Sequence, residues 1–153
     1  MPKNNSSFLL QMVTPEQIIY QQMAQKLIVS TLEGEITILP QHTSLVAAIK
    51  PGEVHILEAS QSGNSKKERL MVISEGVVEV LDNKVRLLVQ TADRVEELNR
   101  QKILEAKKLA EEMIEKARKK GDIDEKNFAD LESTLQREIA RLKVYDRYRK
   151  NRG

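Results

Sequence analysis

The residues best suited to chemistry lie in and beside one stretch, GEITILPQHTSLVAAIKPGEV, residues 34–54. It contains His42, and His55 directly after it is the only other histidine in the chain. Histidine is the usual general base and metal ligand at neutral pH, so each one is a candidate. Neither histidine has a second histidine at helical spacing or an adjacent pair of acids. We therefore interpret His42 as a loop-packing or interface residue.

Two glutamates, Glu33 and Glu35, flank Gly34 and could in principle form a carboxylate pair for acid–base work. A hairpin turn that exposes both charges to solvent explains the same pattern more simply. The chain has no cysteine, no nucleophile elbow, no glycine-rich phosphate loop and no H-E-x-x-H motif. The sequence therefore predicts neither a catalytic site nor a metal site.

The end of the chain, RLKVYDRYRKNRG, is strongly basic and carries a single acid, Asp146. Its basic residues are Arg141, Lys143, Arg147, Arg149, Lys150 and Arg152. Tyr145 and Tyr148 are interleaved and could stack on bases, which is one route to nucleic-acid binding. A basic helix that docks on an acidic protein surface and a solvated helix end are the alternatives. The net charge of +2 gives no further support to a nucleic-acid partner.

Residues 1–91 read as a β domain, because short runs rich in β-branched residues alternate with Pro, Gly, Asn, Asp and Ser. The runs are FLLQMVT, QIIY, KLIVSTL, EITILP, SLVAAI, EVHILEA, ERLMVIS, GVVEVL and KVRLLVQ. The last two are joined by Asp82-Asn83, a pair that tolerates positive φ and predicts a two-residue hairpin turn. The expected fold is an antiparallel β-sandwich or flattened barrel.

Residues 92–153 read as an antiparallel two-helix hairpin. Asp93 and Glu96 resemble a capping box that would open the first helix. Gly121 is suited to end that helix and Asp124 to cap the next one. The predicted seams are Ile103, Ala106, Ala110, Met113 and Ala117 on the first helix, and Phe128, Leu131, Leu135, Ile139, Leu142 and Tyr145 on the second.

Charge density separates the two parts of the chain. Eight Lys/Arg and nine Asp/Glu precede Ala92, whereas seventeen and fourteen follow in a shorter segment. A two-helix hairpin has little core of its own, so we expect it to dock on another surface and to be able to exchange that surface for a second one. No segment approaches the roughly 20 apolar residues of a membrane span, and the N-terminus does not read as a signal peptide.

The motifs together resemble the epsilon subunit family of F-type ATP synthases. The family pattern is close to G-E-L-x-I-x-P-G-H-x-P-L-x-x-x-I-x-x-G, and the matching residues here are Gly34, Glu35, Ile38, Pro40, His42, Leu45, Ile49 and Gly52. SEGVVEVLDNKVRLLVQTADR is similar to the stretch that leads into the family's hairpin. Glu105–Glu112 is similar to the family's E-A-K-x-x-A-E-E core. Gln41 stands where the family usually has glycine, and Ser44 where proline is common.

The resemblance implies a non-catalytic rotor subunit that couples rotation of the membrane ring to the catalytic head. Glu33, Gly34 and Glu35 would contact the ring of c subunits, and Pro40 and His42 would contact the gamma subunit. The hairpin would inhibit ATP hydrolysis in an extended state. The acidic segments of the alpha and beta subunits would then meet the basic residues Arg137, Arg141, Lys143, Arg147, Arg149 and Lys150. The protein would lie peripherally at the cytoplasmic face of the membrane, without inserting into the bilayer or binding nucleic acid.

The resemblance also implies that no cofactor is required. Family members that bind ATP carry I/L-D-x-x-R-A at the start of the first helix, where this chain reads Leu98-Asn99-Arg100-Gln101-Lys102-Ile103. Asn99 lacks the charge of the aspartate, and Lys102 lacks the planar fork of arginine. The positions of this degraded nucleotide site are Asp93, Asn99, Lys102, Arg137 and Arg141. We expect weak or absent ATP binding.

Overall fold

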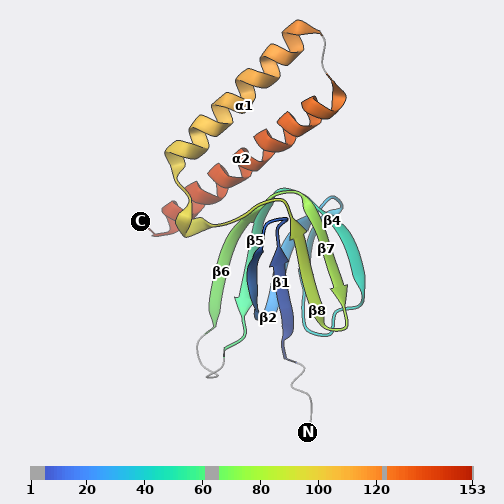
Figure 1. Ribbon diagram of the computed structural model, residues 1–153. Coiled ribbons are helices and arrows are strands. Elements are labelled where there is room, and N and C mark those ends of the chain that lie inside the picture. The colour runs from blue at the N-terminus through green and yellow to red at the C-terminus, as the bar shows by residue number, and fades with distance from the viewer. Residues whose placement is uncertain (1–5, 61–65, 122–123, 153) are drawn as a thin grey trace. The chain divides into compact units, whose positions relative to one another are not determined.

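The computed structural model describes residues 6–60, 66–121 and 124–152, and they divide into two compact units, residues 1–93 and 94–153. The first unit is built from strands (Figure 1). They are β1 (Phe8–Val13), β2 (Ile18–Thr31), β3 (Gly34–Ile38), β4 (Leu45–Ile49), β5 (Gly52–Glu58), β6 (Lys67–Ile73), β7 (Gly76–Leu81), β8 (Lys84–Val89) and β9 (Ala92–Arg94).

Five of these strands close into a ring. The hydrogen-bonded order runs β1-β8-β7-β4-β2, and β2 also pairs with β1. Beyond β2 the sheet continues through β5, β6 and β9, while β3 pairs with β2 alone. A closed path leaves few exposed edges, so the β-sandwich predicted from the sequence is confirmed in its barrel-like form. One pairing departs from the antiparallel expectation, because β1 and β8 run parallel.

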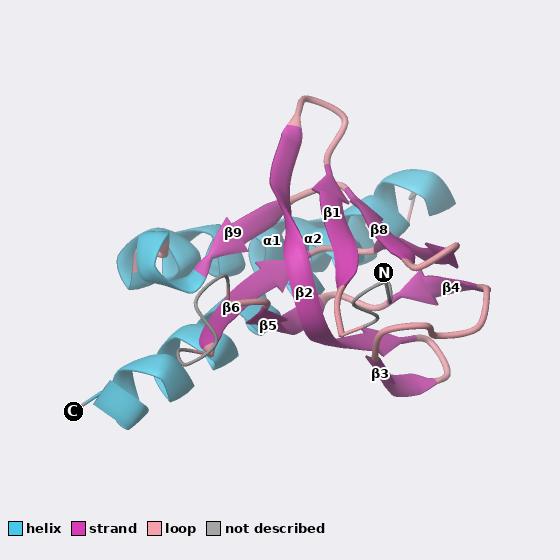
Figure 2. Ribbon diagram, turned by 90° about the horizontal axis from the view of Figure 1, so that it is seen from below, coloured by secondary structure: helices cyan, strands magenta, loops and turns pink. Residues whose placement is uncertain are grey.

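The long strand β2 pairs with different strands along its length and so belongs to both layers of the sandwich (Figure 2). Its first half pairs with β1, and its second half pairs with β3 and β5. The register with β5 shifts between Ala24 and Lys26, as at a β-bulge, which lets a strand bend from one layer into the other. The sequence predicted two runs here, because the polar residues Gln21, Gln22 and Gln25 separate them. The strand is nevertheless continuous. Gln21 and Gln22 pair with β1 and expose their side chains to solvent, and Ala24 between the two apolar runs is buried in the core.

Alternation of buried and outward residues builds the core of this unit. Phe8, Leu10 and Met12 of β1 point inward, as do Val85, Leu87 and Val89 of β8. The β7–β8 turn is as predicted, with φ of 50° at Asp82 and 60° at Asn83. Gly76 pairs with Val89, and a Cβ there would collide with the backbone carbonyl of Leu88.

In the second unit the structure describes a 3₁₀ turn, η1 (Val95–Glu97), followed by α1 (Arg100–Lys120) and α2 (Glu125–Arg152). The predicted capping box is wrong: Asp93 belongs to β9 and Glu96 to η1. The N-cap of α1 is instead Asn99, whose side chain accepts a hydrogen bond from the Lys102 amide at 3.2 Å. The capping roles of Gly121, at φ 64°, and of Asp124, which accepts from the Lys126 amide, are confirmed.

The predicted helical seams need correction at two positions. On α1 the buried residues are Ile103, Ala110 and Ile114, whereas Met113 is exposed. Three helical turns from Ile103 span about 10.8 residues, which leads to Ile114 and not to Met113. On α2 the buried residues are Glu138 and Val144, and Ile139 is exposed.

Candidate functional site

The Glu33–Glu35 segment forms the tight turn between β2 and β3. Thr31 pairs with Gly34, and the Thr31 hydroxyl donates to the Gly34 carbonyl at 2.7 Å and accepts from the Glu33 amide at 3.2 Å. Gly34 has φ 126°, a conformation that favours glycine, and no atom lies near the place of a Cβ. Leu32 at the tip is 72% exposed, and both glutamates are exposed. The turn therefore presents an apolar tip flanked by two carboxylates.

The Pro40–His42 loop follows β3 and is fixed by backbone contacts. His42 is half-buried, its amide donates to the Leu39 carbonyl, and its Nδ1 donates to the Thr43 carbonyl at 2.8 Å. This leaves Nε2 as the ring nitrogen able to bond a partner. Gln41 has φ 64°, so the position that is usually glycine in the resembling family keeps a left-handed conformation.

Asn83 ties this loop to the rest of the domain, a role that the sequence analysis missed. Its side-chain oxygen accepts from the Gln41 amide at 2.8 Å, and its side-chain nitrogen donates to the Ser7 carbonyl at 2.8 Å. Its own carbonyl accepts from the Leu9 amide. The signal available in the sequence was only that Asn83 occupies a hairpin turn, which says nothing about partners so far away along the chain.

An exposed row of apolar residues crosses the outward face of the ring. The cross-strand register places Ala48, Val77, Leu88, Val13 and Ile18 side by side on β4, β7, β8, β1 and β2. We call these five residues the outer apolar row. Ile18 is 53% exposed, Leu88 43% and Val77 38%, while the next row along the strands is mainly polar, with Glu79, Arg86, Gln11 and Gln21.

This row and the Pro40–His42 loop lie at the two ends of the same strands. Asn83, which binds the loop, stands at the turn where β7 ends and β8 begins, whereas Val77 and Leu88 lie at the other end of that hairpin. A contiguous exposed apolar patch of this kind is typical of an interaction surface. The arrangement can bind a partner but contains no convergent reactive groups.

The positions of the degraded nucleotide site are distributed over both units. Asp93 is in β9, Asn99 caps α1, and Lys102 is an exposed residue in the first turn of α1. Arg137 and Arg141 lie one helical turn apart on α2. Arg141 donates to Glu138 at 2.7 Å, and Glu138 is only 5% exposed. Two of these side chains thus have structural roles, Asn99 as a helix cap and Arg141 as the partner of a buried acid.

The basic end of the chain forms the last turns of α2. Lys143, Arg147, Arg149 and Lys150 are exposed, and basic residues fill the final turn. Cations at a helix C-terminus are stabilised by the helix dipole, which explains in part why the sequence accumulates them there.

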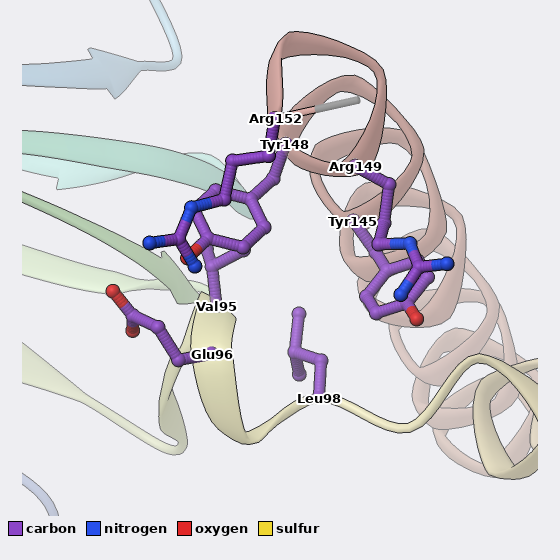
Figure 3. Close-up of a pocket in the computed structure, with 7 residues that line it drawn as sticks. All are labelled: Val95, Glu96, Leu98, Tyr145, Tyr148, Arg149 and Arg152. Carbon is purple, nitrogen blue, oxygen red and sulfur yellow. The ribbon is translucent and has the colours of Figure 1, made fainter.

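The same turns line a pocket of about 450 Å³ within the helical unit (Figure 3). Its lining residues are Val95, Glu96, Leu98, Tyr145, Tyr148, Arg149 and Arg152. The guanidinium of Arg152 lies over the Tyr148 ring, 5.3 Å from its centroid, and Nη1 donates to the Tyr148 hydroxyl at 2.8 Å. Both tyrosines are candidates for stacking on bases from the sequence alone, but nothing in the sequence indicates that they line a pocket together with η1.

Two negative findings apply to the described residues. Within residues 6–60, 66–121 and 124–152, no group of three or more His, Asp or Glu side chains is arranged to hold a metal ion. No helix in the described part of the chain is long and apolar enough to span a membrane.

Comparison with known proteins gives consistent matches. Residues 7–95 match the family model of the ATP synthase delta/epsilon chain β-sandwich domain. The chain is 34% identical over 142 residues to the ATP synthase epsilon chain of Syntrophomonas wolfei, covering 93% of this chain and 96% of that one.

One solved structure shows the same fold, and a second gives a weaker alignment. A chain in the Euglena gracilis mitochondrial ATP synthase, solved as OSCP/F1/c-ring, superposes with a TM-score of 0.67 at 23% identity, covering 88% of this chain and 79% of that chain. A chain from the central stalk and c-ring of the Tetrahymena thermophila enzyme aligns at a TM-score of 0.48 and 19% identity, covering 58% of this chain and 67% of that chain.

Proposed function

The chain belongs to the ATP synthase delta/epsilon family, as a non-catalytic epsilon subunit, and on this premise we propose that it is a rotor joint. In this proposal it couples rotation of the ring of c subunits to the catalytic head through the gamma subunit. The observation that carries the proposal is the outer apolar row, which gives the β domain an apolar surface suited to a permanent partner.

The gamma subunit is the proposed partner of this face. Burial of the exposed parts of Ile18, Val77 and Leu88 would stabilise the contact through the hydrophobic effect. The Pro40–His42 loop would contact gamma at the other end of the strands, with His42 Nε2 available for a hydrogen bond. Because Nδ1 is already engaged with the Thr43 carbonyl, the ring orientation is fixed before binding.

The Glu33–Glu35 turn is the proposed contact with the ring of c subunits. Its exposed Leu32 tip and two flanking carboxylates can meet a polar loop surface without any rearrangement of the strands beneath. The closed ring of strands supports transmission of torque, because a hydrogen-bonded barrel has few soft edges. As part of this complex the protein would lie peripherally at the cytoplasmic face of the membrane.

The helical hairpin is the proposed regulatory element. The exposed cations of α2, at Lys143, Arg147, Arg149 and Lys150, are suited to acidic segments of the alpha and beta subunits. Docking there in an extended state would block rotation in the direction of hydrolysis. The nucleic-acid alternative receives no support from the family match.

We test the docking surface with the double variant Val77→Glu/Leu88→Glu, which places two charges in the outer apolar row. The expected result is loss of co-purification with gamma, by more than about tenfold in affinity, because each buried charge would lack a partner. Thr37→Glu, an exposed β3 residue outside the row, is the control and is expected to bind gamma normally. Normal gamma binding by the double variant would show that the outer apolar row is not the surface that contacts gamma.

Weak or absent ATP binding is a second expectation. Asn99 lacks the negative charge of the aspartate in the ATP-binding motif, and Lys102 lacks the planar guanidinium of its arginine. Arg141 is already paired with Glu138, so its charge is partly neutralised before any nucleotide binds. Isothermal titration of the chain should therefore show no binding tighter than roughly millimolar. Tight binding that is lost in Arg137→Ala and retained in Lys143→Ala, an exposed cation on the same helix, would contradict this.

A further inference from the structure

Folded elements occupy most of the segment from Ala92 to Asn99. β9 (Ala92–Arg94) pairs with β6, η1 (Val95–Glu97) follows without a gap, and Leu98 and Asn99 then lead directly into α1. Every residue from Ala92 to Glu97 belongs to a folded element. Leu98 and Asn99 belong to no element, so the folding of η1 decides whether the flexible stretch before α1 is these two residues or the whole segment 95–99.

The 3₁₀ turn η1 is too short to persist without outside support. One hydrogen bond closes it, from the Leu98 amide to the Val95 carbonyl at 3.2 Å. Isolated turns of this kind are unstable in water because the entropy of ordering them exceeds the gain from one hydrogen bond. Its persistence depends on packing.

The end of α2 supplies packing for η1. α2 contacts η1, and Val95 is only 1% exposed. In Figure 3 the Leu98 side chain projects between the rings of Tyr145 and Tyr148, which come from successive turns of α2. The Arg152 guanidinium covers the Tyr148 ring and holds its hydroxyl.

An ion pair between the start of α1 and the end of α2 is a second contact in this region. Nε of Arg100, the first residue of α1, lies 3.0 Å from Oδ1 of Asp146 on α2. Both side chains are half exposed, so this ion pair alone is weak and easily screened by salt. The ion pair therefore adds little to the attachment beyond the packing of the two tyrosines.

We propose that Tyr145–Arg152, the last two turns of α2, form a clasp that holds η1 folded and thereby limits the flexible stretch before α1 to Leu98 and Asn99. While the clasp is closed, Val95–Glu97 keep the 3₁₀ conformation. When the clasp opens, η1 melts and the segment 95–99 becomes a flexible linker. Only the regulatory consequence rests on the proposed function, since the clasp itself is a property of the chain alone.

Hydrogen exchange of the full chain tests the clasp directly. In Tyr148→Ala the Leu98 amide is expected to exchange at least about tenfold faster, because η1 loses its packing partner. Tyr148→Phe keeps the ring and is expected to stay within about twofold of the parent chain. Lys150→Ala removes an exposed cation from the same turn, outside the pocket lining, and serves as the matched control.

A second variant covers the case in which Tyr148→Ala disturbs the whole hairpin. A chain ending at Arg147 loses the Tyr148 ring and Arg152 but retains the buried Val144. Its Leu98 amide should exchange rapidly while the amide of Ala110, in the middle of α1, stays protected. Unchanged exchange at Leu98 in both variants, or equal acceleration in Lys150→Ala, would overturn the clasp. Neither outcome depends on whether the hairpin inhibits ATP hydrolysis.

Discussion

Gln41 holds the loop before His42 in a left-handed conformation that L-amino acids adopt at a cost. Its φ is 64°, and its amide donates to Asn83, so the conformation is imposed by the neighbouring β7–β8 turn. The loop keeps its shape although glutamine replaces the glycine expected from the family pattern. The backbone at Gln41 therefore stays in a strained conformation, and the loop does not change its shape to relieve that strain.

Gln41→Gly should relieve this strain. The left-handed conformation costs an L-residue about 1–2 kcal/mol, whereas glycine loses about 0.5–1 kcal/mol more chain entropy on folding. The expected net gain is about 0.5–1 kcal/mol in the free energy of unfolding, measured by urea denaturation. Gln41→Ala keeps the strain and should give no gain. A glycine variant no more stable than the parent would show that the loop is not strained.

Single residues were predictable where local rules suffice. The positive φ of Asp82 and Asn83, the left-handed cap at Gly121 and the capping role of Asp124 all follow from neighbours within a few positions. The contacts from Asn83 to Gln41 and Ser7 could not be predicted, because they depend on tertiary pairing of distant segments.

Among the elements, β9 changes how the hairpin should be removed. The charge pattern places a boundary after Thr91, but Ala92–Arg94 forms a strand paired with β6. A cut at Thr91 therefore damages the sheet as well as removing the helices.

A chain ending after Arg94 is the better test of inhibition. It keeps β9 and removes η1, α1 and α2, so assembly with the complex is expected to be retained. If the hairpin inhibits hydrolysis, the ATPase activity of the assembled complex should rise severalfold over the full-length chain. A chain ending after Thr91 should show the same rise with lower thermal stability. An unchanged ATPase activity in both would argue against an inhibitory hairpin.

The buried faces of α1 and α2 were only partly predictable from the spacing of apolar residues. Ile103 and Ala110 were placed correctly, whereas Met113 was assigned to the seam and the buried residue there is Ile114; spacings of three and four both occur on an amphipathic helix. The burial of Glu138 had no signal in the pattern, because its ion pair with Arg141 makes an acid acceptable at a buried position.

For the whole molecule, the sequence predicted a β domain followed by a helical hairpin, but it did not predict which strands pair with one another. Alternation identifies a strand and its inward face, yet the same pattern fits either neighbour and either direction. The parallel pairing of β1 with β8, and the outer apolar row that it completes through Val13 and Leu88, emerge only when the ring is closed.

That parallel pairing also constrains how the protein is made. β1 leaves the ribosome before the other strands of the ring, and its partner β8 emerges only after all of them have been synthesised. Until then β1 can pair with β2 alone, and Phe8, Leu10 and Met12 lack the inner residues of β8 that complete their core. Such long-range closure is slow compared with local hairpin formation. The inward residues of β1 should thus stay incompletely covered until residue 89 has been translated and has cleared the exit tunnel.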